Sequence, residues 1–124
     1  MTFVGAEMAE QISSSPFACD MSAIEPEQRS QHIAAIKELF QTVQEVQELP
    51  NGYAFRMPNE TGLLMRTAEF VAREKLCCPF FGFKIEIEPN NGGLWLHLTG
   101  RDGVKPFIAA EIGNNLRKTV AIHR

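Results

Sequence analysis

Two alternating segments constrain the fold of this chain more than any other feature. Residues 83–88 alternate strictly between apolar and charged side chains, and residues 94–99 alternate between leucine and polar or larger side chains. The segment between them, Pro89-Asn90-Asn91-Gly92-Gly93, is typical of a turn. We therefore predict an antiparallel hairpin with one apolar and one mixed face, which requires other elements to cover the apolar face.

The remaining elements follow from apolar spacing and from turn residues. Apolar side chains recur every three or four residues after Pro26, which predicts a helix that runs to about Glu48. A turn at 49–52, a short strand at 53–57 and a second helix at about 61–76 follow. A third helix is expected at about 103–112, and residues 119–122 are compatible with a short edge strand.

The order helix, strand, helix, strand, strand, helix is typical of an α+β fold, with a small, mostly antiparallel sheet and helices packed on one face. Strands 53–57 and 83–88 are connected through a helix, so we expect them to be parallel neighbours. A length of 124 residues fits one domain. We assign residues 19–124 to this domain and residues 1–18 to a mobile N-terminal arm.

Charge and hydropathy exclude several classes of function. The formal net charge of −3 argues against a nucleic-acid partner, and no apolar run is long enough to cross a membrane. Nine phenylalanines are more than a small sheet with helices on one face can easily bury. We therefore expect a homodimer that uses the sheet surface or edge together with the arm. A small ligand is a separate partner class, which depends on the cysteines.

The three cysteines, Cys19, Cys77 and Cys78, are the only chemical lead. An odd number does not suit a secreted disulfide scaffold, and the N-terminus does not resemble a signal peptide. Adjacent cysteines rarely bridge each other, because the resulting ring strains the peptide between them. We therefore expect free thiols in a soluble, cytoplasmic protein.

Free thiols in this pattern predict a site for a soft metal ion or a thiol-reactive ligand. Thiolates favour zinc, copper(I) or mercury, and Cys19 would join Cys77 and Cys78 as a third ligand. The fourth ligand would be Glu74, His32 or His97. Arg73 lies four residues before Cys77 and could lower the pKa of a thiol.

Two other interpretations remain open at this point. Free cysteine often packs as a small apolar side chain, which would make the protein a structural or interaction module without chemistry. A small thiol-dependent enzyme would instead use Cys77 or Cys78 as its nucleophile, with Glu74 or His97 as the base. His97 is also expected to face Lys84 or Glu86 across the hairpin, as a surface pair without function.

The cysteine segment also carries a resemblance. Glu74-Lys75-Leu76-Cys77-Cys78-Pro79-Phe80-Phe81-Gly82-Phe83 resembles the E-R-x-C-C-P-F-L-x-F segment of a group of small, uncharacterised bacterial proteins. Cys19, the segments 49–56 and 98–100, and the segment 103–107 are similar to that group as well. Lys75 stands where the group usually has arginine, and Arg101 stands where proline is common. The resemblance implies a soluble bacterial protein and supplies no activity.

Overall fold

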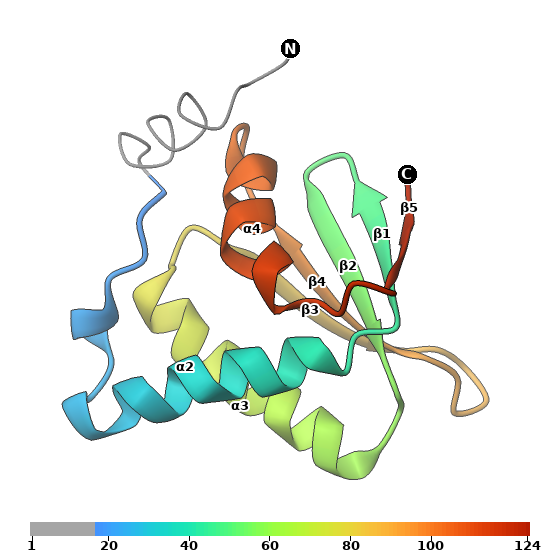
Figure 1. The fold of residues 1–124 in the computed structure, drawn as a ribbon, viewed down its shortest axis with the longest axis horizontal. Helices are drawn as coiled ribbons and strands as arrows, with labels where there is room; N and C mark the ends of the chain where they lie inside the picture. The colour runs from blue at the N-terminus through green and yellow to red at the C-terminus, as the bar shows by residue number, and fades with distance from the viewer. Residues whose placement is uncertain (1–16) are drawn as a thin grey trace.

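A computed structural model describes residues 17–124 and has helices on one face of a five-stranded sheet (Figure 1). The described helices and strands, in chain order, are a short 3₁₀ turn η1 (Met21–Ala23), α2 (Pro26–Gln41), β1 (Glu45–Leu49), β2 (Gly52–Met57), α3 (Thr61–Cys77), β3 (Gly82–Ile87), β4 (Leu94–Thr99), α4 (Val104–Ile112), a 3₁₀ turn η2 (Gly113–Asn115) and β5 (Ala121–His123). The α+β class predicted from the sequence is confirmed.

The predicted hairpin forms the β3–β4 side of the sheet. The strand order is β3-β4-β2-β1-β5, and Ile85 pairs with Leu96 in an antiparallel register. Leu94, Leu96 and Leu98 are fully buried beneath the helices, whereas the alternate side chains of β4 are half-buried. The alternation of leucine with other residues thus predicted correctly which face of β4 the helices cover.

The first helix is shorter than predicted. It ends at Gln41, and Val46 belongs to strand β1 rather than to the helical stripe. Val43 and Val46 satisfy the helical spacing, but residues 45–49 also pair with β2 through a tight turn in which Leu49 lies opposite Gly52. Pairing with β2 makes Val46 part of the sheet and buries its side chain against the core. A continued helix could not form this pairing.

The prediction that strands 53–57 and 83–88 are parallel neighbours is also wrong. Strand β4 lies between β2 and β3 and is antiparallel to both. The only parallel pair among the described strands joins β1 to β5 at the other edge, so the sheet is mixed. The short edge strand expected near 119–122 is found at Ala121–His123.

The N-terminal arm lies mostly outside the described residues, and its mobility stays a prediction. Phe17, the first described residue, is buried in the core, where its ring contacts Phe80 and Phe107. No helix in residues 17–124 is long and apolar enough to cross a membrane.

Candidate functional site

The three cysteines meet at the C-terminal end of α3. Cys77 is the last residue of this helix, and the backbone N–H of Cys78 still donates to the Glu74 carbonyl at 2.7 Å. Cys19 reaches the same place from the segment before η1, where the N–H of Asp20 donates to the Cys77 carbonyl at 2.7 Å. Backbone hydrogen bonds therefore hold both segments in place at the site.

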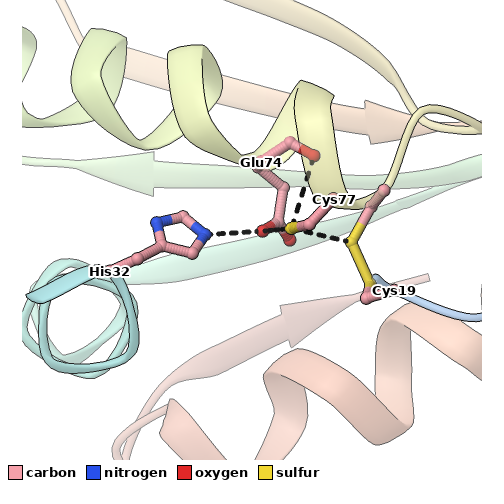
Figure 2. The surroundings of a disulfide bond; sticks show 5 residues. Cys19, His32, Glu74 and Cys77 are labelled. Carbon is pink, nitrogen blue, oxygen red and sulfur yellow. Dashed lines mark hydrogen bonds and ion pairs between the residues drawn. A yellow bond between two sulfur atoms is a disulfide. The ribbon is translucent and has the colours of Figure 1, made fainter. Parts of the chain in front are cut away.

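Cys19 and Cys78 form a disulfide, with their Cα atoms 4.7 Å apart (Figure 2). The prediction of free thiols is wrong for these two residues and right for Cys77, which is buried. Cys77 and Cys78 do not bridge each other, as expected, although their sulfurs are 3.6 Å apart. The pairing depends on the fold, because 59 positions separate the partners and only the docking of the N-terminal segment on α3 brings them together.

Behind Cys77 lies a buried carboxylate and imidazole pair. The Glu74 Oε1 atom is 3.4 Å from the Cys77 sulfur and 2.9 Å from Nε2 of His32, which projects from α2 (Figure 2). Within residues 17–124, Nδ1 of His32 has no hydrogen-bond partner. If the proton were on Nδ1, that buried N–H donor would be unsatisfied, and the lone pair of Nε2 would face the carboxylate. The proton therefore belongs on Nε2, which donates to Glu74.

Cys77 is a poor thiolate in this environment. Burial, then the negative charge of Glu74 and the hydrogen bond to it, raises the pKa of the Cys77 thiol to about 12. At neutral pH, Cys77 is therefore a protonated thiol whose S–H donates to Glu74. This raised pKa argues against the interpretation in which Glu74 acts as a base and activates Cys77 as a nucleophile.

Two overlapping groups of side chains have the donor atoms to hold a metal ion. Cys19, Glu74 and Cys78 form one group, and the second consists of His32, Glu74 and Cys77. In each group the donor atoms lie within 4.8 Å of one another. Glu74 belongs to both groups, so it is the central oxygen donor of the cluster.

A cavity of about 520 Å³ opens beside the disulfide. Its walls come from α2, η1, the end of α3 and the region of α4 and η2, and they include Cys19, Glu74 and Cys77. Cys78 is fully buried and does not line the cavity. Cys19, which is half-buried, is therefore the disulfide residue that faces the cavity.

The other suggested residues lie away from this cluster. Arg73 lines an outer groove between α2 and α3 together with Glu38 and Glu69. His97 belongs to the half-buried set of β4 side chains, and its Nε2 is 3.4 Å from Oε1 of Glu86. His97 lies opposite Lys84 in the register and outside both groups of donor atoms, and its contact with Glu86 is a cross-strand pair.

His32 is one of the three candidates for the fourth ligand, and the structure places it next to Glu74. His32 is fully buried, whereas the adjacent Ile33 of the same helix is 60% exposed on the cavity wall. The signal was present, because His32 stands four residues before Ile36 and seven before Leu39 on the stripe of α2. A histidine in an apolar stripe indicates a buried polar partner, which here is Glu74.

No family model, curated protein or solved structure matches this chain. The resemblance of the segment 74–83 to small bacterial proteins therefore stays a prediction. The functional argument depends on the geometry of the cysteine cluster.

Proposed function

We propose that the protein binds one soft metal ion when its disulfide is reduced, through the thiolates of Cys19, Cys77 and Cys78 and the carboxylate of Glu74. The observation that carries this proposal is the convergence of three sulfurs and one buried carboxylate at the end of α3. Three thiolates and one oxygen ligand suit zinc, and the sulfur-rich set also suits copper(I) or mercury.

The distances in the cluster are compatible with tetrahedral coordination. Zn–S bonds of about 2.3 Å place two sulfurs of a tetrahedral site about 3.8 Å apart. The sulfurs of Cys77 and Cys78 are already 3.6 Å apart. Reduction would free the Cys19 sulfur from Cys78, so that it could take a separate position beside the other two sulfurs. The backbone hydrogen bond from Asp20 to Cys77 does not involve the Cys19 sulfur.

The electrostatic environment favours a cation at this place. The C-terminal end of a helix carries a partial negative charge, and both Cys77 and Cys78 lie at the end of α3. Glu111 faces the same cavity, and loss of hydration and then the charge of Glu74 raise the pKa of its carboxyl. A bound metal ion would compensate this negative charge.

His32 supports the proposed ligand set without being part of it. A carboxylate ligand is commonly held in place by a hydrogen bond from a neighbouring donor, which fixes the direction of its free oxygen. The Nε2–H group of His32, 2.9 Å from Glu74, is suited to this role.

Metal titration of the reduced and the oxidised protein tests the proposal. The protein is reduced with a phosphine, which does not add competing thiols, and zinc is titrated against a chromophoric chelator. We expect one zinc ion per reduced chain and no stoichiometric binding by the oxidised chain, in which two of the three sulfurs are bonded to each other.

Serine variants and a carboxylate control identify the ligands. Cys77→Ser and Cys78→Ser should each abolish stoichiometric binding, and Glu74→Gln should weaken it, because a neutral amide replaces the carboxylate ligand. Glu69→Gln is the matched control, because Glu69 is exposed on the same helix. Equal binding by the reduced and oxidised chains, or unchanged binding by both serine variants, would refute the proposal.

A structural role is the second candidate. Its support is the burial of Cys77 and Cys78, together with a disulfide that ties the N-terminal segment to α3. On this interpretation, reduced protein binds no soft metal ion, and Cys77→Ser changes only the free energy of unfolding. The titration above separates the two candidates.

A further inference from the structure

In the part of the chain that the structure describes, a cavity reaches the disulfide on the Cys19 side, and Cys78 is buried. Of the two disulfide residues, Cys19 lines the cavity of about 520 Å³, whereas Cys78 is fully buried. The cavity volume lies within the range of small-molecule sites in proteins. A molecule inside the cavity therefore meets the Cys19 sulfur before it meets the Cys78 sulfur.

The lining of the cavity is that of a small organic ligand. Met21, Ile33, Ala34 and Ile36 give it an apolar wall next to Cys19. The carboxylates of Glu74 and Glu111 also line it, and Lys37 is the one cationic side chain among its described lining residues. This arrangement suits a neutral or cationic molecule with a short carbon body better than an anionic one.

We propose that the oxidised protein exchanges its disulfide with a small, neutral or cationic organic thiol that enters this cavity and attacks Cys19. Thiol–disulfide exchange proceeds by attack of a thiolate on one sulfur and departure of the other. The entering thiolate forms a bond to the Cys19 sulfur, the Cys19–Cys78 bond breaks, and Cys78 leaves with the bonding electron pair. The proton lost by the entering thiol balances the proton that Cys78 gains.

The position of Cys77 assists the departure of Cys78. The S–H group of Cys77 donates to Glu74 in the oxidised protein, and the Cys77 sulfur is 3.6 Å from the Cys78 sulfur. A rotation of this S–H group would direct its proton to the charge that develops on Cys78. A second molecule of the thiol then attacks the external sulfur of the mixed disulfide and releases Cys19. The net reaction converts two thiols into one small disulfide and leaves three thiols in the protein.

The exchange is measured with three probes that differ mainly in charge. Oxidised protein is incubated with 2-mercaptoethylamine, 2-mercaptoethanol or 2-mercaptoethanesulfonate, with a metal chelator present. The reaction is quenched with acid, and the mixed disulfide is located by peptide mass spectrometry. We expect the adduct on Cys19, and rates per thiolate at least threefold higher for the amine and the alcohol than for the sulfonate.

A matched pair of variants tests the route of entry. Ala34→Phe narrows the cavity and should slow the exchange at least fivefold, whereas Ala72→Phe, at an exposed position of α3 outside the cavity, should not change it. The Cys78→Ser variant tests the same route without a change in the cavity lining. Its Cys19 thiol should form a lasting mixed disulfide with hydroxyethyl disulfide, because the Cys78 thiol that would displace the adduct is absent. An adduct on Cys78 in the oxidised protein, equal rates for the two phenylalanine variants, or a preference for the sulfonate would overturn the proposal.

The two proposals fail independently. The exchange is measured on oxidised protein without metal, and the metal titration is measured on reduced protein without thiols. Loss of thiol selectivity would leave metal binding intact, and absence of metal binding would leave the exchange at Cys19 intact.

Discussion

Reduction of the Cys19–Cys78 disulfide should lower the free energy of unfolding by about 4 kcal/mol. The bond closes a loop with a sequence separation of 59 residues. For a loop of this length, the loss of chain entropy in the unfolded state corresponds to about 4 kcal/mol at 25 °C. This is a large fraction of the ~5–15 kcal/mol by which most domains are stable, so the reduced protein is expected to be folded but only marginally stable.

Urea denaturation of the same wild-type protein in its two redox states measures this difference without changing a side chain. Thiol counting after denaturation provides the redox check, because one thiol is expected in the oxidised chain and three in the reduced chain. Cys19→Ala is the matched control, since it has no Cys19–Cys78 bond and should not respond to the reductant. A difference below about 1 kcal/mol between the redox states would refute the argument from loop closure.

Three further predictions concern the buried pair, the free thiol and the sheet edge. His32→Leu leaves the Glu74 carboxylate without its imidazole donor and should cost about 3–5 kcal/mol by chemical denaturation, whereas adding Glu74→Leu should restore part of the loss. With a Cys77 pKa of about 12 against an ordinary 9.0, alkylation of the native protein should keep accelerating from pH 9 to pH 11, and Glu74→Gln should shift that profile to lower pH. Because the thiol ionises later in the folded than in the unfolded chain, its contribution to stability is complete below about pH 9 and is lost as the pH rises towards 12. Ile85 is exposed on the edge strand β3, so Ile85→Lys should convert the homodimer expected from the sequence into monomers in light scattering, whereas Met65→Lys, at another exposed apolar position, should not.

The elements whose periodicity is unambiguous could be predicted from the sequence. The hairpin 83–99 alternates on both strands around a turn rich in asparagine and glycine, and α3 lies between Pro58 and Pro79 with a clear apolar stripe. Residues 43–49 are different, because Val43 and Val46 suit a helix while Val46 equally suits a strand. The pairing of this segment with β2 decides between the two, and pairing is a property of the tertiary structure.

The candidate site was predictable in its residue types and not in its bonding. The adjacent cysteines, the third cysteine and Glu74 at helical spacing indicate a cluster, and the structure brings all four together. The pairing of Cys19 with Cys78 rather than Cys77 depends on how α3 ends, with Cys77 as its last residue and Cys78 at the cap position just after it. His32 lies on a second helix, 42 positions before Glu74 in the sequence. The packing of the two helices creates their contact, so residue spacing in the sequence could not predict it.

The disulfide also determines how the chain carries a mechanical load. A force applied between Cys19 and the C-terminus passes through the sulfur–sulfur bond, so the closed segment that contains α2, β1, β2 and α3 cannot lengthen while the bond is intact. The 46 residues from Pro79 to Arg124 remain extensible, and they span roughly 160 Å when they are fully extended. Reduction adds the closed segment to this length, roughly 200 Å more. The redox state of one bond thus sets how far the protein can stretch before its backbone is taut.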